Sequence, residues 1–390
     1  MSNTLTGLIP TLYEALDVVS REMVGFIPAV NTDHQAARAA VGQPVLSFAS
    51  PAVVTANITP GVTAPNDGDQ VITNIPLFIT KSKYAAIRYG GEEALGLNNN
   101  GPQALRILSD QFQQGFRALV NEMETDIWRT AYQGASRAVG TAGTTPFGTN
   151  GVLSDFALAR QVLEDNGAPT STLQYVAGSN AMANLRGKQA VLFRVNEAGS
   201  SDMLRTGLTA EVEGFQLRNS NSVQSVTKGT GAAYTTSAAG FAKGATSIGL
   251  ITGAGTVLAG DVVSFAGDTN NYVVTTGIAA PGTVVIAAPG LRQALPAAAT
   301  AVTVGASFVA NMAFSRNAIA LATRLPANIG AQLGGKPGDM ADDVMIMTDA
   351  MTGLNFEVSL YRQYRQIRYE IGIAWGQSAI KPEHLCIGLG

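Results

Sequence analysis

The sequence predicts an α+β protein whose chain leaves one region, builds a small all-β domain and then returns. Residues 229–310 carry only four charged residues, set among short apolar runs rich in Gly, Ala, Thr and Val. A long amphipathic helix is expected upstream, over residues 102–134. A long strand with strict period-two alternation is expected downstream, over residues 367–375. The charge-poor stretch is therefore predicted to be an inserted β-barrel or sandwich domain.

Composition limits the function classes. The chain has 390 residues, which predicts two or three domains with sizeable cores. Charged residues make up 14%, below the roughly 25% of typical soluble domains, so much surface is expected to be buried against other copies of the chain. The net charge of -3 argues against a dedicated nucleic-acid binder. Neither a signal segment nor an apolar run long enough to span a membrane is recognised, so a cytoplasmic origin without membrane contact is expected.

The first 90 residues predict a short helix and a long hairpin. Residues 12–24 place apolar side chains at helical spacing, and residues 1–44 as a whole are expected to form an N-terminal arm. Two β-like runs, Val45 to Ala56 and Val71 to Tyr89, flank the turn-rich stretch TPGVTAPNDGDQ. The outer half of this hairpin, residues 45–90, holds few large apolar groups. It is therefore expected to lie on a neighbouring molecule.

One long helix is expected to serve as a spine. Apolar side chains recur at steps of three and four from Leu105 to Tyr132, and Gly134 ends the pattern. At 1.5 Å per residue, residues 102–134 would make a rod of roughly 50 Å. Residues 91–150 are accordingly expected to hold this spine and a peripheral domain.

Short helices and strands alternate on either side of the inserted domain. Residues 151–228 are expected to form the first part of a central domain and to include a helix capped by Ser154 or Asp155. Residues 229–310 are expected to form short strands bounded by glycines and prolines. Residues 311–390 are expected to complete the central and peripheral domains and to end in strands.

A loop rich in Gly, Pro and Asp carries the nearest match to a catalytic motif. Residues 330–337, GAQLGGKP, satisfy the first part of a phosphate-binding loop. Pro337 occupies the position that must offer a hydroxyl to magnesium, so a flexible glycine loop is favoured over a nucleotide site. Asp339, Asp342 and Asp343 follow without the spacing of a calcium loop, which favours a solvated acidic loop.

The histidines and the cysteine predict neither a catalytic site nor a metal site. His34 and His384 are the two histidines, and no Ser-His-Asp or His-pair pattern accompanies them. The solitary Cys386 excludes an intramolecular disulfide. His384 and Cys386 would share a face of an extended segment as a thiol-imidazole pair. A buried cysteine beside a satisfied or exposed histidine is the favoured interpretation.

Residues 361–370, YRQYRQIRYE, interleave tyrosines with three arginines. Arg362, Arg365 and Arg368 could stack on and clamp single-stranded nucleic acid. However, the second half of this stretch continues the strand that reaches Trp375. The arginines are therefore interpreted as solvent-side or intersubunit groups.

The order of these parts resembles the major capsid (coat) protein of tailed double-stranded DNA phages, with its Hong Kong 97-like fold. The insert makes the chain similar to the branch that carries an extra β-barrel insertion domain. The resemblance rests on the spine helix 102–134, on AGDVVSFAG at 259–267 and on the tail IRYEIGIAWGQSAIKPEHLCIGLG at 367–390. That tail is similar to the family's closing pattern of an aromatic strand, a polar turn, a basic residue with Pro, and a Gly-rich end.

The resemblance implies a structural protein of the virion, assembled in the host cytoplasm, with no enzymatic activity and no cofactor. Copies would form pentamers and hexamers and close an icosahedral shell around double-stranded DNA. Residues 1–44 would be the arm, 45–90 the extended loop, and 151–228 with about 310–365 the central domain. A scaffolding protein and a portal are the implied partners, DNA contact would be nonspecific, and a decoration protein is an open alternative. No motif supports crosslinking through Lys81 or Lys83.

Two other function classes stay open. A secreted surface-layer or adhesin-like structural protein is favoured by the Thr-, Gly- and Ala-rich insert and opposed by the unrecognised signal segment. A nucleotide-dependent enzyme would have to use the loop at residues 330–337. Both are weaker than a self-assembling protein, because a long hairpin with little core of its own and a low surface charge indicate burial against other copies.

Overall fold

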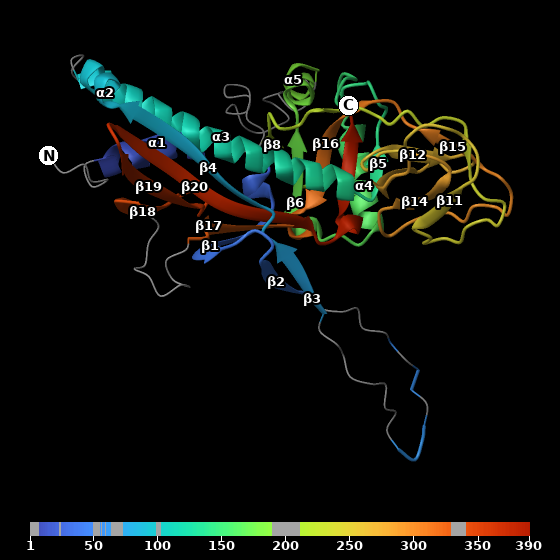
Figure 1. Cartoon of the computed structure of the whole chain (residues 1–390). Coiled ribbons are helices and arrows are strands. Elements are labelled where there is room, and N and C mark those ends of the chain that lie inside the picture. The colour runs from blue at the N-terminus through green and yellow to red at the C-terminus, as the bar shows by residue number, and fades with distance from the viewer. Residues whose placement is uncertain are drawn as a thin grey trace, which may run out of the picture.

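A computed structural model describes residues 8–22, 25–49, 55, 57–58, 60–63, 73–98, 103–188, 211–328 and 341–390. These residues form helices, two large β-sheets and a two-stranded ribbon that projects from the body (Figure 1). The expected mixture of helix and strand is confirmed. Residues 330–337 and Asp339 lie outside the described residues, so the loop that resembles a phosphate-binding motif stays a sequence-based prediction.

The spine is the long helix α3, Gln103–Gly134, which runs along the body (Figure 1). Its 32 residues span roughly 48 Å at 1.5 Å per residue. Phe112, Phe116 and Ile127 are fully buried on it, as their helical spacing predicted. The short helix α2, Gly91–Asn98, precedes it.

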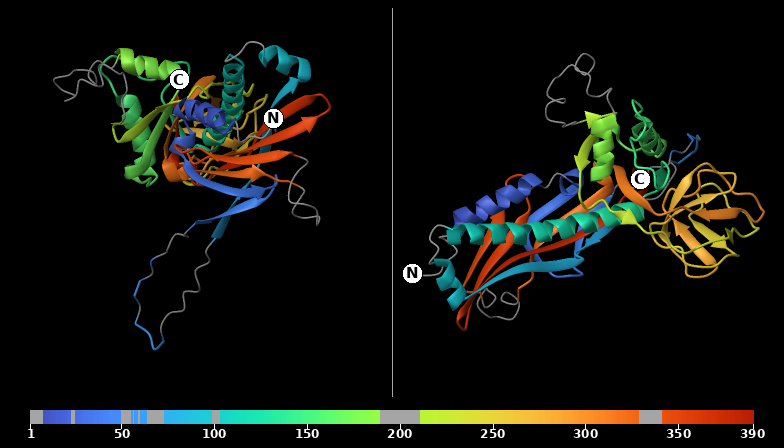
Figure 2. Two further views of the ribbon diagram at one scale, coloured as in Figure 1. Left: turned by 90° about the vertical axis from the view of Figure 1, so that its left-hand side faces the viewer. Right: turned by 90° about the horizontal axis from the view of Figure 1, so that it is seen from above.

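Helix α1, Ile9–Glu22, lies alongside α3 (Figure 2). Three apolar side chains of α1 are buried in the same core as the spine: Leu12, Leu16 and Val19. This packing stabilises α1, since the intrinsic helix propensity of so short a segment is too weak to do so alone. The 3₁₀ turn Ile27–Ala29 then leads into the first strand of a large sheet. The described part of the expected arm is thus packed into the body.

A six-stranded sheet lies against the spine. Five of its strands follow the order β1-β17-β20-β19-β18, and the sixth, β4, lies outside this order and pairs with residues 366–375 of β20. Phe116 of the spine contacts Phe356 edge-to-face at 5.1 Å between ring centroids. Ile371, Ile373 and Trp375 are fully buried on β20, which confirms the predicted alternation. The strands are β1 Asn31–Ala39, β4 Lys81–Gly90, β17 Ile319–Pro326, β18 Asp343–Thr348, β19 Asn355–Gln363 and β20 Gln366–Ala379.

The projecting ribbon is shorter than predicted. Strand β2, Pro44–Ala49, pairs antiparallel with β3, Thr73–Phe78, and with no other described strand. The prediction that the hairpin continues to Tyr89 is wrong, because β4 pairs with β20 over ten consecutive residues instead. Thr80 donates its backbone N–H to the Trp375 carbonyl at 3.0 Å, which turns the chain from the ribbon into the sheet.

A second, larger sheet runs through the central region in the order β10-β15-β12-β13-β5-β21-β16-β6-β8-β7, with β9, β11 and β14 off this path. The central region also contains helices α4, Ser154–Asp165, and α5, Ser179–Lys188. A separate core rich in aromatic side chains surrounds the fully buried Tyr175. The predicted alternation of short helices and strands is confirmed for the described residues of this region. The strands are β5 Arg137–Val139, β6 Leu173–Ala177, β7 Glu211–Val212, β8 Phe215–Asn219, β9 Ser225–Val226, β16 Phe308–Ser315 and β21 Leu385–Leu389.

The predicted cap of α4 is wrong. Leu153 occupies the N-cap position, and no side chain caps the helix. The Asp155 carboxylate instead accepts the backbone N–H of Phe147 at 2.6 Å. It therefore holds the preceding loop, where Phe147 stacks on Phe156 at 4.3 Å between centroids.

The charge-poor stretch forms short strands around a hydrophobic core of its own (Figure 1). Tyr234, Phe265 and Tyr272 are among the largest buried side chains of this core. The stretch joins the central region through pairing of β13 with β5. Its strands are β10 Tyr234–Thr235, β11 Ser247–Leu250, β12 Val262–Phe265, β13 Asn271–Thr276, β14 Gly282–Ile286 and β15 Ala301–Val304.

Candidate functional site

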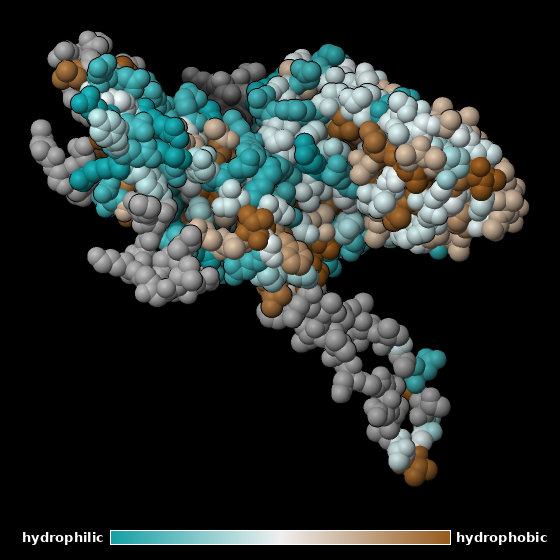
Figure 3. Space-filling view, viewed as in Figure 1, coloured by the Kyte–Doolittle hydropathy of each residue, from teal (hydrophilic) through white to brown (hydrophobic). Residues whose placement is uncertain are grey.

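The outer face of the ribbon is an exposed apolar surface close to the body. Pairing places Pro44 opposite Phe78 and Leu46 opposite Pro76, so these four side chains share one face, which we call the hairpin surface. Leu46 is 56% exposed and Phe78 is 50% exposed. Apolar residues gather here at the base of the projection (Figure 3). The hairpin surface is thus available to a partner.

The opposite face of the ribbon is anchored. Leu77 is buried in a small cluster with Ala39 and Ala374, so one face of β3 packs on the body. At the end of β3, the backbone lies so close to Gly376 of β20 that an added Cβ there would be 2.0 Å from the Phe78 carbonyl oxygen. Contact between the ribbon and the sheet therefore requires glycine at this position.

Lys81 ties the start of β4 to the spine. Its Nζ donates to Glu122 Oε1 at 2.8 Å and to Asp126 Oδ1 at 2.9 Å, and it lies 5.9 Å from the centroid of the Trp375 ring. Burial lowers the pKa of Lys81, but its hydrogen bonds with Asp126 and Glu122 outweigh this and keep the pKa above its ordinary value. Lys83 lies 3.6 Å from the same Glu122. Both lysines are thus paired within the chain.

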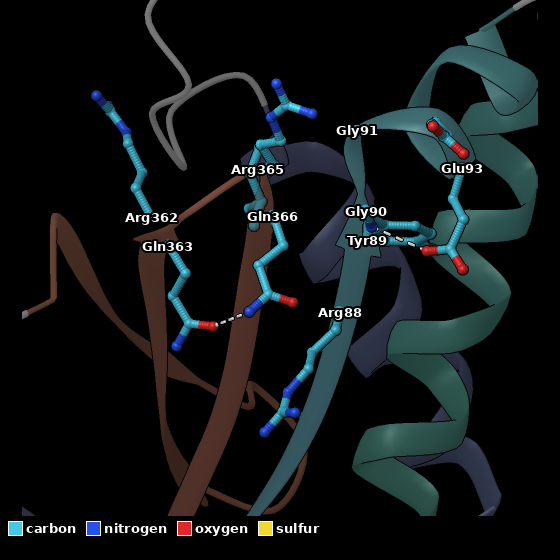
Figure 4. Close-up of a pocket in the computed structure, with 11 residues that line it drawn as sticks. Arg88, Tyr89, Gly90, Gly91, Glu93, Arg362, Gln363, Arg365 and Gln366 are labelled. Atoms are coloured by element: carbon cyan, nitrogen blue, oxygen red, sulfur yellow. Dashed lines mark hydrogen bonds between the residues drawn. The ribbon is translucent and has the colours of Figure 1, made fainter.

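The far end of the six-stranded sheet carries the arginine-rich turn. Arg362 of β19, Arg365 of the β19–β20 turn and Arg88 of β4 line one side of an open basin, and Glu93 of α2 lies on the other side (Figure 4). Glu93 accepts the backbone N–H of Gly90 at 2.8 Å. The three guanidinium groups point in different directions (Figure 4). This geometry fits surface groups better than a clamp that converges on one base.

The third arginine of this stretch is engaged within the sheet. Arg368 pairs with Glu370 and lies 5.2 Å from the centroid of the Tyr84 ring. Tyr369 contacts Phe112 of the spine edge-to-face at 5.5 Å. Tyr364, at the turn itself, is 87% exposed. The tyrosines and arginines thus do not form one stacking platform.

His384 and Cys386 do not form a nucleophilic pair. His384 lies in the 3₁₀ turn Pro382–His384, and Cys386 is fully buried on β21. Burial raises the pKa of the Cys386 thiol to about 12, which keeps it protonated. Its Sγ contacts the Ile387 carbonyl at 3.8 Å. The interpretation of Cys386 as a buried structural cysteine is thereby favoured.

His34 is a partly buried histidine on β1. Its Nδ1 lies 2.7 Å from Thr323 Oγ1 of β17. Burial lowers the pKa of His34 below its ordinary value of 6.5, Arg324 adds to this effect, and Asp33 and Asp349 oppose it. The imidazole is therefore held neutral inside the sheet.

Acidification is expected to destabilise the protein through His34. Because the pKa of His34 is lower in the folded state than in the unfolded state, its contribution to stability is present above pH 6.5 and is lost as pH falls through the folded pKa. We expect His34→Gln to reduce the loss of unfolding free energy between about pH 7.5 and about pH 5.5. Urea unfolding at both pH values measures this. An equal loss in the variant and the wild type would contradict the assignment.

The acidic residues provide no metal site in the described part of the chain, where no group of three His, Cys, Asp or Glu side chains could hold a metal ion. Asp342 accepts the backbone N–H of Arg362 at 2.7 Å, so it ties the start of β18 to the end of β19. No described helix is both long enough and apolar enough to cross a membrane.

The few charges of the charge-poor stretch, residues 229–310, are mostly used inside the chain. Asp261 is buried and accepts the backbone N–H groups of Gly229 and Leu258. Burial raises the pKa of Asp261, and these hydrogen bonds oppose the rise. Asp268 accepts the Tyr272 hydroxyl at 2.6 Å. These carboxylates therefore hold loops in place and do not serve as surface contacts.

Glu124 is a buried acid that sequence reasoning missed. It lies on the spine, where its Oε2 accepts the N–H of Phe26 at 2.8 Å and its Oε1 accepts that of Ile27 at 2.7 Å. The Ser220 hydroxyl donates to Oε2 at 2.9 Å. Glu124 thus joins the N-terminal segment, the spine and the end of β8. Its only sequence signal is an acid among apolar residues on a buried helix face.

No protein-family model and no curated protein matches the chain. Among solved structures, the capsid of the cyanophage P-SCSP1u is 9% identical with a TM-score of 0.48, and the match covers 93% of this chain and 86% of that chain. The mature capsid of bacteriophage PhiM1 is 10% identical with a TM-score of 0.44 and coverages of 94% and 86%. A virus-like particle from Pyrococcus furiosus is 8% identical with a TM-score of 0.40 and coverages of 97%. Structural similarity at these identities and TM-scores does not assign a function to this chain.

Proposed function

We propose that this chain is the major capsid protein of a tailed phage, with a Hong Kong 97-like fold and an inserted β-barrel domain. Copies assemble as pentamers and hexamers into an icosahedral shell that encloses double-stranded DNA. A scaffolding protein and a portal are its partners during assembly in the host cytoplasm, and its contact with DNA is nonspecific. The protein performs no catalysis in this role.

The hairpin surface carries this proposal. A ribbon of two strands is marginally stable alone in water, and β2 and β3 pair with no third described strand. Its exposed face is formed by proline, leucine and phenylalanine, whose burial would stabilise an assembly by roughly 25 cal/mol per Å² of apolar area. A second copy of the chain is the partner that removes this face from water. Many such contacts, each weak, would sum across a closed shell.

The rest of the molecule supports the same role. A spine of roughly 48 Å braced by a long sheet provides a rigid body from which the ribbon extends. The carboxylates of the inserted domain and the lysines at the base of the ribbon are engaged within the chain. Contacts between copies therefore depend on apolar faces and backbone edges more than on isolated ion pairs.

Electron microscopy of the expressed full-length chain, alone and with its cognate scaffolding protein, tests the proposal. Closed shells, tubes or capsomer rings are expected. A protein that stays monomeric at every concentration, with or without scaffold, would contradict it. ATP- or magnesium-dependent stabilisation that Lys336→Ala abolishes would favour the enzyme alternative instead.

Charge placed on the hairpin surface is expected to block assembly and leave the fold intact. In a Leu46→Glu/Phe78→Glu variant, the unfolding free energy of the monomer should change by less than about 1 kcal/mol, because both side chains are half-exposed. Losing the burial of even one of them would raise the protein concentration needed for assembly by roughly tenfold or more. Sedimentation velocity measures this concentration.

Tyr13→Glu is the matched control. Tyr13 is 44% exposed on α1, so the substitution adds one negative charge, half of what the hairpin variant adds, to another exposed aromatic site. We expect Tyr13→Glu to assemble like the wild type. Equal assembly of the hairpin variant and this control would show that the hairpin surface is not an interface.

A further inference from the structure

A cleft of about 460 Å³ lies between helix α4 and two loops of the inserted domain. Arg137 of β5 and Asp165 of α4 line the central side, and Asn270 and Arg292 line the inserted side. The described residues that line it therefore come from the central region and from the charge-poor stretch. A group bound here would contact both.

Arg137 is a buried cation with unused hydrogen-bonding capacity. It is 5% exposed, and its Nε has no partner among the described residues. Its Nη1 donates to Asn270 Oδ1 at 3.1 Å, and its Nη2 donates to the Val162 carbonyl at 3.2 Å and to Asp165 Oδ2 at 3.2 Å. A guanidinium has five N–H donors, so this set leaves donors for a further acceptor.

One carboxylate serves two guanidinium groups in this cleft. Asp165 Oδ2 lies 3.4 Å from Arg292 Nη2 as well as close to Arg137. The remaining polar side chains that line the cleft are neutral: Gln161, Thr269, Asn270, Asn271 and Gln293. The nearby Asp268 uses its two oxygens for Asn270 and Tyr272. Two arginines and one aspartate leave a net charge of about +1 in the cleft.

We propose that this cleft binds an oxyanion, a phosphate or carboxylate group, held by Arg137 and Arg292. Planar guanidinium groups match both kinds of oxyanion, and a partly buried site strengthens the attraction. The volume accommodates a group of this size with its hydration. Bound there, the oxyanion bridges the inserted domain to α4 and limits the movement of one against the other. The inference does not depend on the capsid role.

Thermal unfolding of the unassembled full-length chain with sodium phosphate tests the site. We expect about 10 mM phosphate to raise the unfolding temperature by at least about 2 °C over sodium chloride of equal ionic strength. Arg292→Gln is expected to remove most of this shift. Lys243→Gln, which removes an exposed cation of the same domain outside the cleft, should keep it. A phosphate shift of equal size in these two variants would overturn the proposal.

Gln161→Glu supplies a second variant that does not remove a buried group. A carboxylate at this position places an anion in the cleft, so the variant should be more stable than the wild type without phosphate and respond little to it. If the natural ligand is a carboxylate side chain of a second copy, phosphate will have no effect and Arg292→Gln will impair assembly while Lys243→Gln will not. Absence of a phosphate response together with normal assembly of Arg292→Gln would overturn the oxyanion site.

Discussion

Replacing Glu124 with leucine is expected to lower the free energy of unfolding by roughly 3–5 kcal/mol. The carboxylate accepts two backbone N–H groups, from Phe26 and Ile27, and the Ser220 hydroxyl. Leucine would leave these donors buried without an acceptor, and each unsatisfied backbone group costs about 1–3 kcal/mol. Since the donors come from two separate segments, we expect both to loosen from the spine.

Chemical denaturation measures this loss, and hydrogen exchange at Phe26 and Ile27 locates it. Glu122→Gln is the control, because Glu122 is on the same helix but is about one-third exposed. We expect Glu122→Gln to change stability by less than about 1 kcal/mol. A Glu124→Leu variant as stable as this control, with unchanged exchange, would show that the buried carboxylate does not hold the N-terminal segment.

The pH dependence of Glu124 gives a second readout. Burial raises the pKa of Glu124, and its hydrogen bonds with Ile27, Phe26 and Ser220 oppose the rise. A raised folded pKa means that the stabilising contribution is fully present below the ordinary pKa of 4.5 and is lost as pH rises through the folded value. The stability of the wild type relative to Glu124→Gln should therefore decrease as pH rises.

Gly376→Ala is expected to detach the ribbon from the sheet and abolish assembly. A Cβ at this position would lie 2.0 Å from the Phe78 carbonyl oxygen and 2.9 Å from the Cα of Ile79, and backbone atoms cannot move aside as a flexible side chain can. Overpacking of this kind costs roughly 1–3 kcal/mol or more. The strain would be relieved by shifting the end of β3, which reorients the hairpin surface.

Limited proteolysis of the ribbon and sedimentation velocity together test this prediction. The variant should be cleaved at least about tenfold faster in the ribbon, since opening by 1.4 kcal/mol raises the open population tenfold. Gly187→Ala, on α5, is the control, because an added Cβ there meets nothing within 4 Å. Normal assembly of Gly376→Ala would show that the direction of the ribbon is not set by this close contact.

Local pattern was sufficient to predict the elements whose side chains repeat regularly. The spine and the alternating strand that reaches Trp375 were found because a stripe of apolar residues depends only on the period of the element that carries it. The charge-poor stretch was recognised for a related reason. A small β-core of Val, Tyr and Phe needs few charges at any position.

Pairing between distant residues could not be read in the same way. Strand β4 has the composition of a hairpin strand, yet it pairs with β20 nearly 300 residues later. The partner and register of a strand depend on which sheet edge is unpaired in the folded protein. The local spacing of residues contains no information about that edge. The prediction of the α4 cap was wrong for a similar reason. The Asp155 carboxylate accepts the backbone N–H of Phe147 in the preceding loop, and local sequence does not show that this donor lies nearby.

Composition and periodicity therefore determined the fold class, the spine and the presence of an exposed ribbon, because each is a property of neighbouring residues. The tertiary structure alone decided which groups meet. Glu124 meets Phe26 and Ser220, Gly376 meets Phe78, and Arg137 shares Asp165 with Arg292. These contacts join segments separated by tens to hundreds of residues, and they form only after the cores have brought those segments together.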